Sequence, residues 1–492
     1  MARTRARNYQ HILKYTGVFG SVEVLKILIG LVRNKLVAMI LGPDGMGLMS
    51  LFNSTIKLIS DTTNLGIPIS SVREISDATR DNDSQRLEKT VQTVRMLSIA
   101  VAVVGMIFCA SLCSLLNKWT FTWGDHTLHF VLLSPVVGIM AILAGEVAIL
   151  KGMRQLRQLA QLSIYNITVA LLLSVPLFYL WGEAAIVPVL ILTELVQLLL
   201  VMRCSYRLVP FSIGKWAQLP KAGKSIATLG FAFVFSGIFT SGADFLIRTY
   251  LNNVASLEVV GVFNAGFVIV FVYAGMVFSA METDFFPRIS AIGSCGRELN
   301  MTVSEQIEVS ILIAAPMLVF LMVCMPIILP LLYSNSFTPA VEMVQIGLLS
   351  LLFRAVYLPI EYISLARAKS LVFMAQEFVG TALLLTGVIG GYHWANLWGV
   401  GLGLTCAYAL EMLFVMVNSR LVFNYVISLK AVHYLLLQLL MGMAAYAVVV
   451  FAPSTLFYWF GGTVICLLSA GYSLNIIRKK TTIINMLRKK FQ

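Results

Sequence analysis

The first apolar stretch of the chain, residues 11–41, contains the charged side chains Glu23, Lys26, Arg33 and Lys35. A charge at the centre of a bilayer costs about 2.5 to 3.5 kcal/mol on insertion scales, so such residues usually face a protein interior or a wet cavity. At 100° per residue, Glu23, Lys26 and Arg33 share one helix face, whereas Lys35 lies on the opposite side. The first three therefore predict a transport path, and Lys35 is expected to extend to the membrane surface.

A second polar stripe lies in the next apolar stretch, residues 47–70. Lys57 and Asp61 are four residues apart and share one helix face, on which Asn53 and Asn64 also lie. The two stripes together hold three cations, Lys35 aside, against two carboxylates, which leaves one net positive charge. Because Lys and Arg bind phosphate oxygens strongly, the stripes predict a cavity for an anionic headgroup.

Two later apolar stretches also place opposite charges on one helix face. Asp244 and Arg248 are one helical turn apart, and Arg354 lies on the same side as Glu361. Two interpretations stand side by side for these pairs: internal ion pairs that hold the bundle together, or substrate-binding and ion-coupling groups. Buried carboxylates in coupled transporters can also take up protons. The candidates for proton or ion coupling are Glu23, Asp61, Asp244 and Glu361.

The composition is that of a membrane protein. The 492 residues have a mean hydropathy of +0.86 and only 12% charged residues, against about a quarter in soluble domains. The net charge of +13 lies mainly in short connections, so nucleic acid is not an expected partner. No metal-ligand spacing, catalytic constellation or phosphate loop is visible. We therefore expect no enzyme activity, metal or cofactor, and we interpret the seven cysteines as small core residues.

Fourteen apolar runs of about 20 residues are long enough to cross a bilayer. They lie near residues 11–41, 47–70, 92–116, 127–150, 159–181, 184–204, 226–250, 258–282, 306–332, 339–364, 371–392, 397–418, 433–452 and 455–477. With both termini cytoplasmic, 27 of the 36 Lys and Arg fall in cytoplasmic segments and eight within spans, while the outside loops hold only Lys118. A wrong helix count would disturb this alternation, so the charges support fourteen spans.

An internal repeat with an offset of about 215 residues suggests a duplicated fold. The segment from Gly47 to Arg73 resembles that from Gly261 to Arg288. An offset of six helices keeps the halves in the same orientation, related by an axis normal to the membrane. The expected parts are an N-terminal lobe of helices 1–6 (1–210), a C-terminal lobe of helices 7–12 (211–430), two extra helices (431–477) and a basic cytoplasmic tail (478–492).

From about residue 10 to residue 430, the chain resembles the Wzx-type polysaccharide flippases of the multidrug/oligosaccharidyl-lipid/polysaccharide (MOP) superfamily, which also holds MATE- and MurJ-like proteins. The clearest mark is the segment KLVAMILGPDGMGL that begins at Lys35. Asn64-Leu-Gly-Ile-Pro, followed by Arg73-Glu-Ile-Ser, is similar to the family pattern, as is Leu331-Leu-Tyr-Ser-Asn-Ser-Phe-Thr-Pro-Ala.

The resemblance implies an all-α fold of two six-helix lobes around a central cavity that works by alternating access. It implies an undecaprenyl-pyrophosphate-linked oligosaccharide, such as an O-antigen repeat unit, that crosses the bacterial inner membrane. It also implies a polysaccharide polymerase and a chain-length regulator as partners, and we expect a monomer. By analogy, the two extra helices could hold a lipid tail. The substrate-binding residues that it implies are Lys26, Arg33, Lys57 and Arg248. We add Arg354 as a further candidate and expect Asn53 and Asn64 to contact the sugars.

Three alternatives stay open. A lipid II flippase lies within the same superfamily, and a MATE-type drug or cation antiporter is disfavoured by the basic stripe. From a different class, an integral-membrane glycosyltransferase or ligase would also handle polyprenyl substrates. That enzyme would need a large outside loop or an acidic catalytic pair, whereas the longest outside loop here is near Lys118–Thr127.

Overall fold

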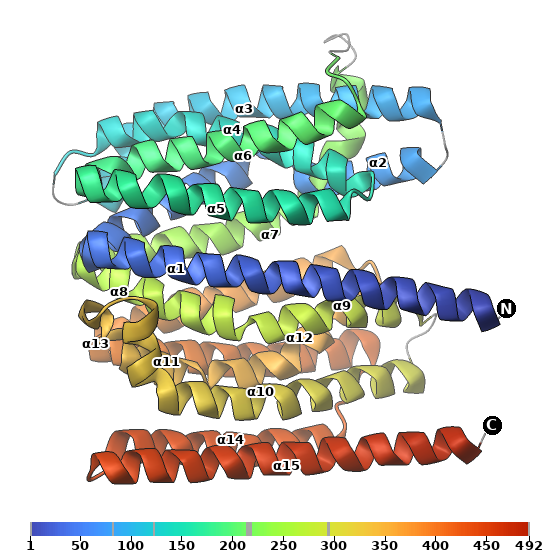
Figure 1. Cartoon of the computed structure of the whole chain (residues 1–492), viewed down its shortest axis with the longest axis vertical. Coiled ribbons are helices and arrows are strands. Elements are labelled where there is room, and N and C mark those ends of the chain that lie inside the picture. The colour runs from blue at the N-terminus through green and yellow to red at the C-terminus, as the bar shows by residue number, and fades with distance from the viewer. Residues whose placement is uncertain (1, 81–82, 122–123, 213–218, 293–295, 491–492) are drawn as a thin grey trace. The chain divides into compact units, whose positions relative to one another are not determined.

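The described parts of the protein are α-helices joined by short connections, as the computed structural model shows (Figure 1). The structure describes the backbone of residues 2–80, 83–121, 124–212, 219–292 and 296–490. Side chains are described between residues 25 and 480, apart from those backbone gaps and residues 156, 219–233, 279–284 and 287. No β-strand occurs within these ranges, and the prediction of an all-α fold is confirmed.

The first compact unit runs to Gly261 and includes Leu332–Ser334. Within it, α3 packs against α4, α4 packs against α6, and α1 contacts both α5 and α7. Figure 1 shows α3, α4, α5 and α6 running side by side. The helices of this unit are α1 (Ala2–Thr63), α2 (Ile67–Arg80), α3 (Ser84–Thr120), α4 (Thr127–Gly152), α5 (Leu156–Trp181), the 3-10 turn η1 (Gly182–Ala185), α6 (Ile186–Leu208) and α7 (Leu219–Val254).

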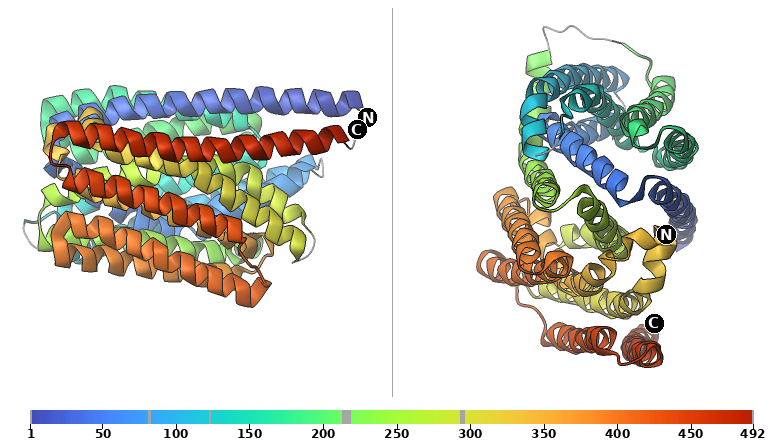
Figure 2. Two further views of the ribbon diagram at one scale, coloured as in Figure 1. Left: turned by 90° about the horizontal axis from the view of Figure 1, so that it is seen from below. Right: turned by 90° about the vertical axis from the view of Figure 1, so that its left-hand side faces the viewer.

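The second unit holds Val262–Leu331 and the residues from Asn335 onward. Its α13 packs against α11 and α12, and α14 pairs with α15, as both views of Figure 2 show. Its elements are α8 (Leu257–Phe267, which begins in the first unit), the π-helix η3 (Val268–Ala274), α9 (Met276–Ala291), α10 (Arg297–Leu332), η4 (Asn335–Phe337), α11 (Ala340–Gly347), α12 (Ser350–Ala366), α13 (Ser370–Phe423), α14 (Leu429–Phe451) and α15 (Thr455–Lys490). The lobe boundary after residue 210 stays a prediction. In the structure, α7 packs with the first unit.

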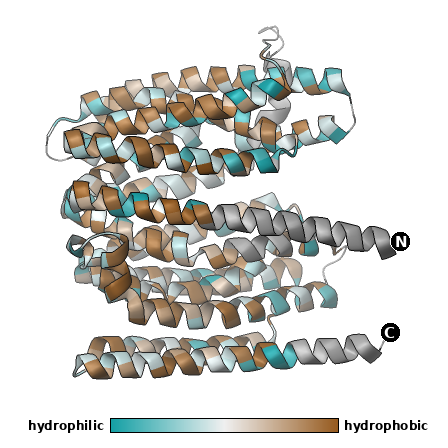
Figure 3. Cartoon of the chain, viewed as in Figure 1, coloured by the Kyte–Doolittle hydropathy of each residue, from teal (hydrophilic) through white to brown (hydrophobic). Residues whose placement is uncertain are grey.

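The helices have the length and composition of membrane spans. Among the described residues, eight helices are long and apolar enough to cross a bilayer, or nine if the bent pair α11 and α12 forms one span. Figure 3 shows the apolar residues along them. Large apolar side chains such as Leu421 and Leu456 are 79% and 82% exposed, which suits contact with lipid tails rather than water. The chain is therefore a multi-pass membrane protein.

Two of the long helices contain a sharp break, so each holds two predicted spans. In α1 the break is at Gly42, whose φ of 66° and ψ of −172° lie outside the helical region. Positive φ is easily adopted only by glycine, and the following Pro43 suits the first turn of the next helix. In α13 the break falls at Ala395 and Asn396, between predicted spans 371–392 and 397–418. The chain thus breaks its first helix at Gly42, between the predicted spans 11–41 and 47–70.

Gly47 of α1 and Gly261 of α8 lie at a close crossing of the two backbones. A Cβ added to Gly47 would lie 2.1 Å from the Leu257 carbonyl oxygen, and one added to Gly261 would lie 2.0 Å from the Pro43 oxygen. Real Cβ atoms essentially never come closer than 3.0 Å, so neither position accepts a side chain without moving a backbone. The crossing therefore depends on glycine at both positions.

A buried ion pair and the hydrogen bonds around it join three helices of the first unit. Arg95 of α3 and Glu146 of α4 are 3% and 2% exposed, and the Arg95 Nε donates to Glu146 Oε1 at 2.9 Å. The rest of the guanidinium donates to Ser205 Oγ and to the carbonyl oxygens of Val209 and Pro210, at 2.9–3.2 Å. Because Arg95, Glu146 and Ser205 are buried, the network is strong only while it is complete.

Candidate functional site

A pocket of about 450 Å³ lies between α1, α4, α5 and α6 of the first unit. Residues at spacings of three and four along one face of α5 form one of its walls. Apolar side chains such as Leu159, Leu162 and Leu200 make up much of its surface. The polar residues that line it are Lys26, Arg33, Lys151, Ser163, Asn166 and Gln197.

Two hydrogen bonds fix polar side chains of this pocket. Arg33 Nε donates to the Oγ of Ser174 at 3.1 Å, and Ser174 is fully buried on α5. Asn166 Nδ2 donates to Gln197 Oε1 at 2.8 Å and so ties α5 to α6. Because the Arg33 Nε bonds to the protein, the terminal nitrogens of its guanidinium are held in a defined direction. A fixed fork of this kind suits an oxyanion ligand.

The second stripe of α1 lies apart from the residues that line this pocket. Asn53 and Lys57 are exposed, and Asp61 is partly buried against Gly237 of α7, with 3.8 Å between its Cβ and the position of an added Gly237 Cβ. The charge of Lys57 acts on Asp61. Asn64 occupies the turn before α2, where its Oδ1 accepts from the Gly66 amide at 2.8 Å. The stripe is thus an accessible polar face in its first half and a structural turn at its end.

Arg248 of α7 is bonded to protein groups. It pairs with the Asp244 carboxylate one turn earlier and donates to the Asp244 carbonyl oxygen at 3.1 Å. Its Nε donates to Ser50 Oγ of α1 at 2.6 Å, and the side chain is only 7% exposed. The structure therefore contains the internal ion pair that was one of the two interpretations of these residues, and Arg248 also connects α7 to α1.

A charged cluster lies among α12 and α13 of the second unit. The Arg354 guanidinium carbon lies 5.8 Å from the centroid of the Phe278 ring, and Glu361 is 5% exposed. Glu411 interacts electrostatically with Arg354 and Glu377. It packs closely on Gly380, where an added Cβ would lie 2.1 Å from the Glu411 Oε1. Arg354 thus lies among several carboxylates, which makes this cluster less suited to a phosphate than the pocket of the first unit.

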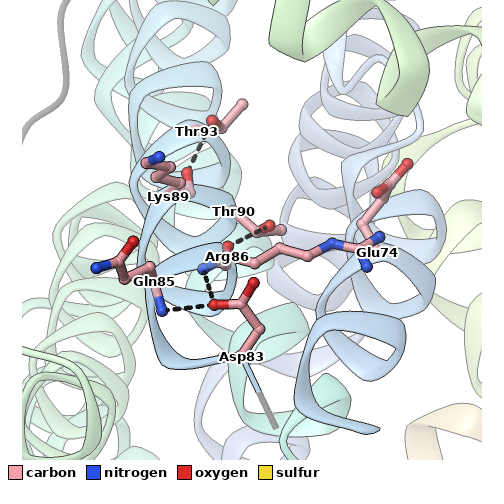
Figure 4. Close-up of a pocket in the computed structure, with 7 residues that line it drawn as sticks. All are labelled: Glu74, Asp83, Gln85, Arg86, Lys89, Thr90 and Thr93. Atoms are coloured by element: carbon pink, nitrogen blue, oxygen red, sulfur yellow. Dashed lines mark hydrogen bonds between the residues drawn. The ribbon is translucent and has the colours of Figure 1, made fainter. Parts of the chain in front are cut away.

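A second pocket, of about 370 Å³, opens between α2 and the start of α3 (Figure 4). Asp83 caps α3 there, because its carboxylate accepts from the backbone amides of Gln85 and Arg86 at 3.0 Å. In Figure 4 the Arg86 side chain extends toward Glu74. The charged residues that line this pocket are of both signs and lie at an exposed helix end, so the pocket shows no preference for an anionic ligand.

Sequence reasoning named some residues of the first-unit pocket and missed others. Lys26 and Arg33 lie in it as their spacing on one helix face suggests, whereas the side chain of Glu23 lies outside the described residues. Lys151, Asn166 and Gln197 also line the pocket, and helical periodicity alone does not point to them. The sequence does contain one signal for the two amides, because Asn166 and Gln197 each lie within an apolar run, on α5 and α6.

The chain is similar to a known family in sequence and to known transporters in fold. The family model described as polysaccharide biosynthesis protein matches residues 12–292, which is more than half of the chain. No curated protein sequence matches it. Among solved structures, it is similar to the lipid II flippase MurJ in an inward closed conformation, with a TM-score of 0.66 and 13% identity over 94% of this chain and 99% of that one.

Two further solved structures share the fold. An inward-facing multidrug resistance MATE family transporter of the MOP superfamily has a TM-score of 0.65 and 16% identity, over 81% of this chain and 94% of that one. A MOP superfamily transporter from Pyrococcus furiosus has a TM-score of 0.55 and 15% identity, over 83% and 93%. The chain therefore belongs to the polysaccharide biosynthesis protein family and has the fold of the MOP superfamily.

Proposed function

We propose that this protein is a flippase that moves an undecaprenyl-pyrophosphate-linked oligosaccharide, such as an O-antigen repeat unit, across the bacterial inner membrane by alternating access. Both termini lie in the cytoplasm, and the substrate enters there. A polysaccharide polymerase then uses the translocated unit, and a chain-length regulator acts with it. The protein works as a monomer.

The observation that carries this proposal is the group of cations that line the pocket or lie exposed along the described part of α1. Lys26 and Arg33 line the pocket, and Lys57 is exposed on the next span. Elsewhere in this unit Glu146 and Asp244 are each paired with an arginine. Because Lys and Arg bind phosphate oxygens strongly, a pyrophosphate headgroup fits these residues better than a cationic drug.

The extent of the fold also supports a lipid-linked substrate. The MurJ structure covers 94% of this chain, and the unmatched remainder is shorter than α14 and α15 together, whereas the MATE structure covers 81%. The extra helix pair is thus shared at least in part with a protein whose title names it a lipid II flippase. Lipid II itself is therefore the second candidate substrate, because it also carries a pyrophosphate on a polyprenyl chain.

In this mechanism Lys26 and Arg33 contact the pyrophosphate in the pocket, and Lys57 contacts it on the next span of the path. The amides of Asn53 and Asn64 contact sugar hydroxyls. Asp61, which lies beside Lys57, lowers the positive charge of the path and releases the headgroup more readily. Arg354, Glu361 and Glu23 are the remaining candidates for substrate or ion coupling. Rocking of the lobes exposes the path first to one side and then to the other.

Charge reversal at Lys57 tests the proposal in vesicles. The Lys57→Glu variant should move a fluorescent undecaprenyl-pyrophosphate oligosaccharide about tenfold to a hundredfold more slowly, since one charge-assisted contact is lost and Asp61 gains a like charge one turn away. The measurement is the fraction of labelled lipid that a membrane-impermeant quencher reaches over time. Lys57→Arg should retain transport, and Lys118→Glu, an exposed change outside the path, is the matched control.

The same vesicles separate the alternatives. Transport of lipid II in place of the oligosaccharide lipid would identify the second candidate, and export of a cationic dye would favour an antiporter. If Lys26→Glu and Lys57→Glu variants, present at normal levels, still transport at the wild-type rate, the assignment of the site is wrong. In cells, deletion of the protein should trap the lipid-linked oligosaccharide in the inner leaflet.

A further inference from the structure

The pocket between α1, α4, α5 and α6 takes residues from four helices, only one of which carries the predicted stripe. Lys151 belongs to the last turn of α4 and is exposed. Lys26 and Arg33 are two turns apart on α1, which is about 10 Å along its axis. The three cations are thus distributed along the pocket.

The polar side chains of the pocket favour an oxyanion. Those that line it, among the described residues, are three cations, one hydroxyl and two amides, with no carboxylate. Arg33 is held by Ser174, and the Asn166–Gln197 bond leaves the Gln197 amide nitrogen a suitable donor to a ligand oxygen. Arg and Lys are the side chains that bind phosphate most strongly.

The remaining walls indicate what the oxyanion is attached to. Leu159, Leu162, Ile167 and Leu200 line the same pocket, in a unit whose helices have the composition of membrane spans. A free inorganic ion would not use this apolar surface, whereas a phosphate joined to a hydrocarbon chain would bury it. A volume of about 450 Å³ is within the range of small-ligand sites.

We propose that this pocket binds the phosphate headgroup of a lipid and that Lys151 and Gln197 belong to the site. The proposal rests on the proposed function where the lipid is the isoprenoid-pyrophosphate substrate. The other source of the same chemistry is an anionic phospholipid that resides in the pocket. In either case Lys151 contacts the phosphate from the end of α4, while Arg33 holds it from α1.

Binding to the purified full-length protein tests this site. Undecaprenyl pyrophosphate and phosphatidylglycerol are titrated separately, and bound lipids are counted by native mass spectrometry. Lys151→Glu should weaken binding of the resident lipid about tenfold or more, because a charge-assisted contact becomes a repulsion. Arg157→Glu is the matched control, since Arg157 is an exposed cation close to Lys151 in sequence that does not line the pocket. Thermal melting of each variant shows that it is folded.

The two lipids identify the source. Weaker binding of undecaprenyl pyrophosphate alone in Lys151→Glu assigns the pocket to the substrate, and weaker binding of phosphatidylglycerol alone assigns it to a resident phospholipid. If both lipids bind Lys151→Glu and Arg33→Glu as tightly as the wild type, the lipid-phosphate site is refuted, even where the wild type transports. If the wild type neither binds nor transports an isoprenoid pyrophosphate, the proposed function fails, and phosphatidylglycerol binding still decides the pocket.

Discussion

Replacement of Arg95 with alanine should lower the stability of the protein by about 3 to 5 kcal/mol, because it leaves the Glu146 carboxylate buried without its partner. The change also removes the donors to Ser205 and to the carbonyl oxygens at 209 and 210, so the end of α6 loses these hydrogen bonds to α3. The measurement is the midpoint of thermal unfolding of the purified protein in detergent, which should fall clearly below that of the wild type.

A double variant separates the role of the charges from that of packing. Arg95→Met with Glu146→Met removes both charges and keeps similar volume, so it should regain much of the stability that Arg95→Ala loses. Glu146→Gln alone should lie between the two, since it keeps a carbonyl acceptor for Arg95 but leaves the guanidinium charge buried. An unchanged melting midpoint in Arg95→Ala would contradict the structural importance of this network.

Alanine at Gly47 or Gly261 should also have a large effect, and one opposite in sign to that expected from helix propensity. Alanine in a helix is normally favoured over glycine by about 0.5 to 1 kcal/mol. Here the new methyl would lie about 2 Å from a backbone oxygen of the other helix, so α1 and α8 must move apart. We expect a lower melting midpoint and slower lipid transport in both variants.

Gly390→Ala is the control for this experiment. Gly390 lies in α13, and a Cβ built there meets nothing within 4 Å, so alanine should leave the melting midpoint unchanged or raise it slightly. A Gly47→Ala variant that melts and transports like Gly390→Ala would show that the helices tolerate separation at this crossing.

Hydropathy and turn residues were enough to predict the all-α membrane fold class. The break at Gly42 follows from a Gly-Pro pair between two apolar runs, which is a local signal. The split of the predicted span 258–282 into α8, the π-helix Val268–Ala274 and α9 has no comparable signal. This split depends on how the segment packs against its neighbours, and the apolar residues of the segment do not specify that packing.

The site was predictable only where its residues share one helix. Lys26 and Arg33 come together through helical periodicity, whereas Lys151 and Gln197 reach the same pocket through the packing of α4 and α6. Glu146 likewise finds its partner in Arg95, 51 residues away. Contacts at such separations follow from tertiary structure, and a single sequence does not contain them.

The crossing at Gly47 and Gly261 has a bearing on how such a protein could arise. Pro43 and Leu257 are separated by 214 residues, and so are Gly47 and Gly261, while Gly47 faces Leu257 and Gly261 faces Pro43. The contact is therefore reciprocal, as in an isologous interface between two identical subunits. In a single-repeat ancestor one glycine would have served both sides of a homodimer. After fusion each copy could change separately, so charges such as those of α1 could specialise in one half while the shared contact kept its glycines.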